Sequence, residues 1–433
     1  MSLLMFEGPA GTGKTYQLLK SARKHLEQHP LDAEQRVLAL TKYHGSRRRM
    51  DIKLRDRDGG VGNALDCVTI DSFAWNLVVR WRSLVERLGL HPVEGDFPSV
   101  TSAAGVLLQR PNVARWVARR YPLVVVDEMQ DCKDGEVTLL GGLEPCVRLL
   151  CGADAFQDLS GDNDNEAISW ASEVGEVVTL TEVHRTHAIG LLEAAQALRN
   201  GRTVGFDATS GFEIKPVATA PQGGALLCWR IRSWARHGPI ALVSGTARGT
   251  SQFADQVIDW ACRNTSKSRY GATAGPYPVE WESADDEAQR ALLDLLCIPD
   301  EATSNICCAS LAAQTDMQGI HDLRDWARRQ LFVRGVSTVT VSDVVNEVGK
   351  IVRRRRAFGP NRLWRRLAMT IYQAKNREFE SVIVLWPLKL AGSLEQKRRL
   401  LYNAVTRACG RAVVIVQDPK DTVMAGPLFA GGA

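Results

Sequence analysis

A glycine-rich octapeptide near the N-terminus has the composition and spacing of a phosphate-binding loop. Residues 8–15 fit the pattern G-x-x-x-x-G-K-[ST] without a mismatch, follow an apolar run and open a predicted helix over Tyr16–Leu26. Glycines let backbone N–H groups converge on phosphate oxygens, and a helix N-terminus adds partial positive charge. We expect Lys14 to neutralise the β and γ phosphates and Thr15 to place its hydroxyl on Mg²⁺. The nucleotide-binding residues are therefore predicted to be Gly8, Pro9, Ala10, Gly11, Thr12, Gly13, Lys14 and Thr15.

Two consecutive acids at the end of another apolar run are the second candidate for chemistry. Asp127 and Glu128 directly follow Leu123–Val126, which has the pattern of a buried strand. A carboxylate in this position can hold Mg²⁺, while its neighbour polarises an attacking water. An acid pair at a strand end is often only a helix cap, so the assignment of Asp127 and Glu128 depends on their combination with the phosphate-binding loop.

Short apolar runs, separated by long connections, must position these residues. The runs are Leu3–Phe6, Val37–Leu40, Leu123–Val126, Val147–Cys151, Ile240–Val243, Ser381–Trp386 and Ala412–Val416. Runs of this kind, with helical patterns between them, are typical of parallel strands with helical crossovers. We therefore predict an α/β fold with two lobes, each built on a parallel sheet.

Two stretches interrupt this pattern and are interpreted as mostly helical insertions. The smaller one, at about 75–111, carries tryptophans and many arginines, and the larger one contains three amphipathic helical patterns. The predicted organisation is a first lobe over 1–190, a second lobe over 191–250 plus 361–433, and an insertion subdomain over 251–360.

The acid pair belongs to a segment, Asp127–Asp131, that resembles the DExQD motif of UvrD/Rep-type superfamily 1 helicases. Further segments resemble that family's motifs and follow in the family's order: Leu40–Tyr43, Thr69–Phe73, Gly152–Gln157, Leu180–Thr186, Thr370–Phe379 and Arg398–Ala408. The resemblance runs from Met1 to about Ile415 and thins through 250–360. It implies two RecA-like P-loop NTPase lobes that bind ATP and Mg²⁺.

The resemblance also implies roles for single residues. Gln157 would sense the γ-phosphate, Arg185 would reach it, and Arg407 would be the arginine finger. Glu378 would approach the ribose, and His184 stands where the family has an adenine-stacking tyrosine. The predicted catalytic residues are thus Lys14, Asp127, Glu128, Gln157, Arg185 and Arg407, with Thr15 and Asp127 on the metal.

Candidate nucleic-acid contacts follow from the same resemblance and from two basic clusters. The motif residues are Thr41, Lys42, Tyr43, Thr69, Ser72, Phe73 and Tyr372. One cluster is Arg47–Arg49; the other is Arg353–Arg356 with Arg362, Trp364, Arg365 and Arg366, which combines cations with an aromatic ring. The alternative for each cluster is a solvated basic face.

The sequence departs from the family pattern at several places. Asn376 replaces a glycine, and asparagine is the non-glycine residue best able to adopt a left-handed backbone. Asp71 replaces a histidine that lies near the nucleic acid in the family. The aromatic–Arg–Gly segment that stacks on bases is absent, and residues 158–164 are acidic there instead. We expect an intact catalytic half and an altered strand-binding half.

Composition excludes membrane, secreted, collagenous and disordered classes. Apolar residues make up 45% of the 433 and charged residues 24%, no apolar run approaches a membrane span, and ten cysteines occur without a CxxC pair. The expected protein is a cytoplasmic ATP hydrolase, a translocase or helicase on single-stranded DNA more than on RNA, with 3′→5′ movement and a partner such as a nuclease in repair or anti-phage defence. The alternative is a regulatory ATPase switch that binds a protein partner without translocating.

Overall fold

The computed structural model describes most of the chain. The described residues are 2–42, 50–52, 54–55, 61, 64–93, 95–159, 165–205, 211–250, 252–282, 285–296, 298, 305–313, 321–358, 366–418 and 428–430. The chain divides into two compact units. The larger contains Met1–Trp281 with Leu363–Ala433, and the smaller contains Glu282–Arg362. Within the described part of the chain, we find no helix with the length and apolar character needed to cross a bilayer.

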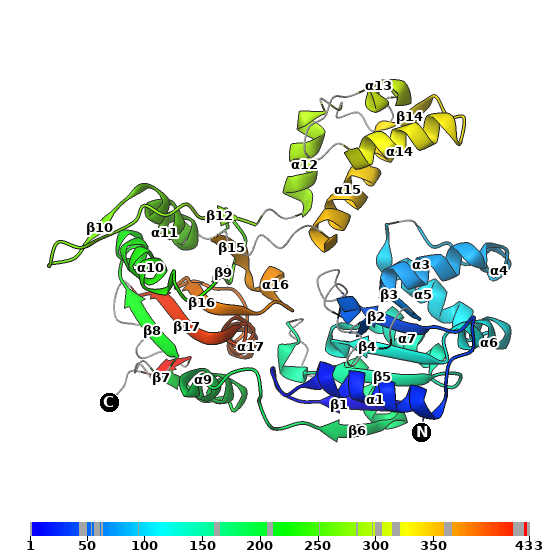
Figure 1. Ribbon diagram of the computed structural model, residues 1–433, viewed down its shortest axis with the longest axis horizontal. Coiled ribbons are helices and arrows are strands. Elements are labelled where there is room, and N and C mark those ends of the chain that lie inside the picture. Colours follow the sequence, from blue (N-terminus) through cyan, green and yellow to red (C-terminus); the bar gives the residue numbers. More distant parts are fainter. Residues whose placement is uncertain are drawn as a thin grey trace. The chain divides into compact units, whose positions relative to one another are not determined.

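The first sheet of the larger unit has six parallel strands in the order β3-β2-β4-β5-β1-β6 (Figure 1). These are β1 Leu3–Glu7, β2 Val37–Thr41, β3 Leu65–Thr69, β4 Leu123–Asp127, β5 Arg148–Ala153 and β6 Glu176–Thr179. Because all six run in the same direction, their carboxyl ends meet at one edge of the sheet. The loops that follow β1, β4 and β5 therefore lie close together.

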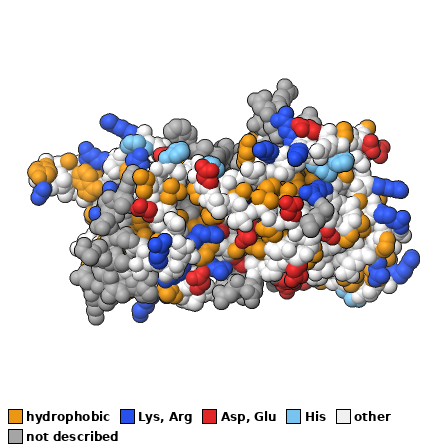
Figure 2. Space-filling model, turned by 90° about the horizontal axis from the view of Figure 1, so that it is seen from below, with side chains coloured by type: hydrophobic (Ala, Val, Ile, Leu, Met, Phe, Trp, Pro, Cys, Tyr) orange, Lys and Arg blue, Asp and Glu red, His pale blue; other side chains and the backbone are white. Residues whose placement is uncertain are grey.

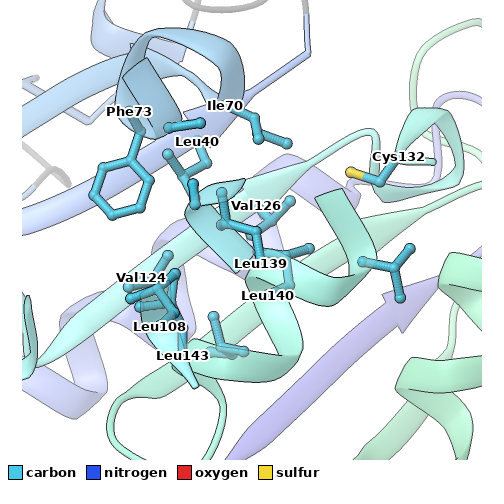
Figure 3. Close-up of a cluster of buried hydrophobic side chains, with 14 of the residues drawn as sticks. Leu40, Ile70, Phe73, Leu108, Val124, Val126, Cys132, Leu139, Leu140 and Leu143 are labelled. Carbon is cyan, nitrogen blue, oxygen red and sulfur yellow. The ribbon is translucent and has the colours of Figure 1, made fainter. Parts of the chain in front are cut away.

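Helices cover both faces of this sheet. Successive side chains of each strand point to opposite faces, so apolar side chains lie on both faces and both need to be covered. Val124 and Val126 face a cluster with Leu140, shown in Figure 3, whereas Leu123 and Val125 face the opposite cluster. The helices of this lobe are α1 Lys14–Gln28, α3 Ile70–Arg80, α4 Arg82–Arg87, α5 Phe97–Leu108, α6 Pro111–Arg120, α7 Asp134–Leu143 and α8 Glu166–Val174. Helix α1 covers one face, and α3, α5 and α7 pack in the cluster on the other.

The second sheet is also parallel and six-stranded, in the order β12-β15-β9-β16-β17-β8 (Figure 1). Its strands are β8 Phe212–Val217, β9 Ile240–Ser244, β12 Glu280–Trp281, β15 Leu367–Thr370, β16 Phe379–Trp386 and β17 Ala408–Gln417. Its helices are α9 Ile189–Arg199, α10 Ala220–Trp234, α11 Gln252–Arg263, α16 Ile371–Ala374 and α17 Leu394–Val405. Along β16, Val382 and Val384 contact the α9–α17 face, and Ile383 and Leu385 contact the α10–α11 face.

The predicted α/β class with two RecA-like lobes is thus confirmed. Each lobe is a parallel sheet between two helical layers. Two short ribbons complete the larger unit: β7 Val204–Gly205 with β18 Phe429–Ala430, and β10 Ser266–Lys267 with β11 Thr273–Ala274. Helix α11 packs its Val257 and Ala261 into the core of the second lobe, so residues 252–281, which the sequence pattern placed with the insertion, lie in the larger unit.

The smaller unit is mostly helical and has a core of its own. Its elements are α12 Asp285–Leu295, β13 Asn305–Cys307, α13 Cys308–Ala312, α14 His321–Phe332, β14 Thr338–Thr340 and α15 Val341–Phe358, with β13 and β14 antiparallel. Leu311, Leu323, Val344 and Ile351 are buried against one another. This core draws on α13, α14 and α15, which explains why the unit is compact.

Candidate functional site

The loop after β1 has a backbone that only glycine accommodates at three positions. Gly11 and Gly13 have φ values of 84° and 81°. A Cβ on Gly8 would lie 2.4 Å from the Leu180 carbonyl oxygen, and one on Gly11 would lie 2.7 Å from Cβ of Arg185. Gly13 then leads directly into α1. The loop therefore lies close to the irregular segment that follows β6, which contains Leu180 and Arg185, and it leads into the N-terminus of α1.

Lys14 and Thr15, at the start of α1, point to the neighbouring strand ends. Lys14 Nζ donates to the carbonyl oxygens of Gly8 and Pro9 at 2.8 and 3.0 Å. Thr15 Oγ1 donates to Asp127 Oδ2 at 3.4 Å, so the hydroxyl and the carboxylate that the sequence analysis assigns to the metal lie next to each other. Oxygen donors of this kind suit Mg²⁺, which takes few protein ligands beside phosphates and water. The donor set therefore fits Mg²⁺.

Glu128 occupies a strained and strongly cationic position after β4. Its φ of 59° is left-handed, a conformation that non-glycine residues adopt rarely and mainly at functional sites. Burial acts to raise the pKa of Glu128, but the positive charges of Lys375 and Lys14 outweigh it and hold that pKa below its ordinary value. Gln130 Nε2 also donates to the carboxylate at 2.6 Å. The carboxylate of Glu128 is therefore held in its ionised form, which can accept a hydrogen bond.

The glutamine after β5 meets the arginine after α17. Gln157 Oε1 accepts a hydrogen bond from Arg407 Nη2 at 3.0 Å. Arg407 is only 2% exposed, and its Nε donates to the Asn403 carbonyl oxygen at 2.9 Å. Arg407 lies two residues beyond α17 rather than on its last turn. Residues 250 positions apart are thus in direct contact.

A second contact of the same kind joins Arg185 to the second lobe. Arg185 Nη2 pairs with Glu378 Oε1 at 2.9 Å, and its Nη1 donates to the Thr406 carbonyl oxygen at 3.0 Å. The neighbouring His184 donates its backbone N–H to Gly11 at 2.8 Å, and its side chain is largely exposed beside the loop. The structure therefore places His184 and Arg185 against the phosphate-binding loop, and Glu378 against Arg185.

Sequence reasoning assigned no role to a buried ion pair next to this site. Lys375 Nζ pairs with Asp131 and also donates to the Gln157 carbonyl oxygen at 3.0 Å. Both charged residues are less than a tenth exposed. Burial raises the pKa of Asp131 to about 6, although Lys375 acts to lower it. Both residues lie in the recognised motifs, so a signal was present, but their pairing was not deducible from positions 244 apart.

The predicted nucleic-acid residues of the first lobe lie at two adjacent strand ends. Thr41 and Thr69 are register partners at the ends of β2 and β3. Thr69 is buried and caps α3 by accepting the Ser72 N–H at 3.2 Å. Lys42 forms an ion pair with the buried Glu136. Burial acts to lower the pKa of Lys42, but the hydrogen bond and the negative charge of Glu136 outweigh burial and raise that pKa. The structure therefore uses these side chains in contacts within the protein.

The remaining nucleic-acid candidates are separated. Phe73 is 6% exposed and packs in the core of Figure 3, whereas Tyr372 on α16 is 59% exposed. Tyr43, Arg47–Arg49, Arg362, Trp364 and Arg365 lie outside the described residues, as do the side chains of Arg353–Arg356. Arg366 is described and lies 4.7 Å above the ring of Tyr277. On the face in Figure 2, Lys and Arg side chains are interspersed with acidic and apolar ones.

Comparison with known protein families finds one matching family model, and it belongs to the same kind of protein as the sequence motifs resemble. Residues 367–415 match the family model of the UvrD-like helicase C-terminal domain. The matched segment spans β15, β16, α17 and most of β17, and it contains Lys375, Glu378 and Arg407. No curated protein matched the chain. The domain match supports the resemblance to UvrD/Rep-type superfamily 1 helicases and indicates a helicase-type function.

Proposed function

We propose that this chain is an ATP-dependent translocase or helicase that acts on single-stranded DNA. The observation that carries the proposal is the hydrogen bond from Arg407 to Gln157. It brings a second-lobe cation beside the loop that holds Lys14 and beside the acids after β4. Phosphoryl transfer needs little covalent chemistry but much stabilisation of charge at the transferring phosphate. Cations from two lobes that converge on one loop supply that stabilisation only while the lobes are together.

The proposed cycle follows from these positions. Lys14 and the loop amides bind the phosphates, and Glu128 accepts a proton from the attacking water. Mg²⁺, held by Thr15 and Asp127, supplies charge neutralisation when bound. Arg407 contributes positive charge from the second lobe, and Arg185 contributes it from the end of the first lobe. ATP binding would draw the lobes together, and hydrolysis would release them. Alternating contacts with the nucleic acid, at the ends of β2 and β3 and at Tyr372, would move the nucleic acid.

Direction, pathway and partner rest on the resemblance. The UvrD/Rep branch moves 3′→5′ on DNA, which we propose for this chain as well. The insertions are small, and several predicted strand contacts are used within the protein, as Lys42 is by Glu136. We therefore propose that separation of duplex DNA depends on a partner such as a nuclease, in repair or in anti-phage defence.

The same observations favour one alternative, a regulatory ATPase switch without translocation. Lys42 is neutralised by Glu136, Phe73 is in the core, and Asp158 follows the sensor glutamine. Acidic groups beside a strand path would repel phosphates. A translocase that contacts several phosphates loses affinity steeply as salt rises, whereas a switch has no such dependence.

The deciding experiment measures the steady-state ATPase rate of the full chain with and without single-stranded DNA, at two salt concentrations. Lys14→Ala serves as the control that removes ATP turnover. Strong stimulation that salt weakens and the control abolishes supports the motor. A rate that is independent of DNA at both salt concentrations contradicts the motor and favours the switch.

A further inference from the structure

A fully buried carboxylate beside the phosphate-binding loop has partners from both lobes. Asp154, the residue after β5, is 0% exposed. Its Oδ1 accepts from Arg199 Nη1 at 2.6 Å, and its Oδ2 accepts from Gln157 Nε2 at 2.9 Å and from the Tyr402 hydroxyl at 3.2 Å. Lys14 Nζ lies 3.9 Å from Oδ2. Two cations therefore share one negative charge.

Arg199 is the closer of these two cations and lies outside every motif of the sequence. It is the last residue of α9, in the second lobe. Its guanidinium lies 5.4 Å from the ring centre of Phe156 and 5.5 Å from that of Tyr402. These two rings contact each other edge to face at 5.0 Å. The stacked guanidinium is thus fixed in place against Asp154.

The ammonium group of Lys14, in contrast, contacts oxygen atoms of the protein itself. Its ammonium group is bound to two carbonyl oxygens of its own loop and lies within reach of Asp154. To reach a β- or γ-phosphate, Lys14 must leave these acceptors. A buried carboxylate that loses a cation is strongly unfavourable unless another cation remains. Arg199 is the group that remains.

We propose that Arg199 is a positioning residue that holds the charge of Asp154 and thereby releases Lys14 to the phosphates of the nucleotide. Tyr402 links this exchange to the second lobe, because its hydroxyl bonds to Asp154 and also accepts the Ala10 N–H of the loop at 2.9 Å. Arg199 does not touch the nucleotide; it acts through Asp154. The proposal rests on the proposed ATP site but not on movement along DNA.

The test is equilibrium binding of a non-hydrolysable ATP analogue to the full chain by calorimetry, without nucleic acid. The variants are Arg199→Gln, Asp154→Asn and the double variant, with Arg199→Lys as the conservative replacement. Arg202→Gln, an exposed arginine three residues beyond α9, is the matched control. The urea midpoint of each variant reports folding independently of binding.

We expect Arg199→Gln to weaken binding roughly tenfold, which corresponds to about 1.4 kcal/mol. Arg199→Lys should restore most of the affinity, and Arg202→Gln should bind as wild type does. In the Asp154→Asn background, where Lys14 has no carboxylate to hold it, Arg199→Gln should have no further effect. Such non-additivity is the signature of two residues that act through one contact.

Other outcomes overturn the proposal. An equal loss in both backgrounds would mean that Arg199 contacts the nucleotide directly, and a loss that follows the urea midpoint would mean that it only packs. If wild type does not bind the analogue at all, both this proposal and the ATP site fail. If wild type binds but DNA does not stimulate turnover, only the motor fails.

Discussion

The side chain of Arg407 is held in place by three hydrogen bonds within the protein. Its guanidinium bonds to Gln157, to the Thr406 hydroxyl and to the Asn403 carbonyl oxygen. We expect Arg407→Ala to lower kcat by about 10³-fold or more, because loss of an arginine finger removes charge at the transition state. Binding of the ATP analogue should change little. Turnover and binding are both measured on the full chain.

The exposed Arg263→Ala is a suitable control for that experiment, since Arg263 lies on the surface of α11. If Arg407→Ala weakened binding and left kcat unchanged, Arg407 would be a ground-state contact and not a finger.

A second residue-scale prediction concerns the pH dependence of stability. Because burial raises the pKa of Asp131 to about 6, the folded chain binds this proton more tightly than the unfolded chain. The resulting stability is complete below the ordinary carboxyl pKa and is lost as pH rises through about 6. From about pH 5 to pH 7, we expect the wild-type free energy of unfolding to fall by about 1 kcal/mol relative to Asp131→Asn.

Urea unfolding of both proteins at several pH values checks this prediction. Parallel curves over the whole range would show that Asp131 does not titrate there in the folded chain.

The sequence predicts single residues of the candidate site, but it does not predict which residues they contact. Lys14, Glu128 and Arg407 follow from motifs whose spacing is local. Arg199 does not, because an arginine at the end of an amphipathic helix has no distinguishing local pattern. The role of Arg199 depends on its contact with Asp154, which is 45 positions away in the sequence. Two residues so far apart come into contact only because of the way the strands and helices are arranged.

At the scale of elements, the apolar runs predicted seven strands of the two sheets, but none of the four edge strands β3, β6, β8 and β12, and not the interior strand β15. Strands β2, β4, β9 and β16 each contain an unbroken run of at least four apolar residues, because both faces of these strands are buried there. Edge strands have fewer apolar residues: β6 is largely exposed, and β8 contains Lys215 and Pro216. Proline is tolerated at an edge, where one row of N–H groups has no neighbouring strand. These strands are therefore too polar to be predicted from apolar runs in the sequence.

The turn between α16 and β16 gives an element-scale prediction. Asn376 has a φ of 66°, the left-handed conformation expected for asparagine in place of glycine. Asn376→Gly should change the free energy of unfolding by less than about 1 kcal/mol, whereas Asn376→Val should cost about 1–2 kcal/mol more than glycine at the same position. Urea unfolding compares the two variants. Equal stability of both would show that the turn changes conformation to accept valine.

At the scale of the molecule, the smaller unit is expected to be dispensable for folding of the larger one. Its buried residues come from 296–352 and belong to none of the four cores of the larger unit. Replacing 283–362 with a flexible linker of about eight residues should leave a chain that unfolds cooperatively and still binds the ATP analogue. Calorimetry and urea unfolding check both properties.

Excision of α11 is the matched control for that deletion. Phe253 and Val257 of α11 are buried against β9 and α10, so its removal should prevent folding. An insoluble chain after removal of 283–362 would contradict the prediction and show that the larger unit needs the smaller one.

The order of strands along the chain also sets the order in which the two lobes can fold during synthesis. Every strand of the first sheet lies within residues 3–179, so this lobe can fold while the ribosome is still translating the second. The second sheet cannot be completed until β17 has been synthesised, because β17 pairs with both β16 and β8. Arg407 emerges immediately before β17. We therefore expect a nascent or truncated chain that ends before Arg407 to carry the phosphate-binding loop without the proposed arginine finger, and to hydrolyse ATP no faster than the Arg407→Ala variant.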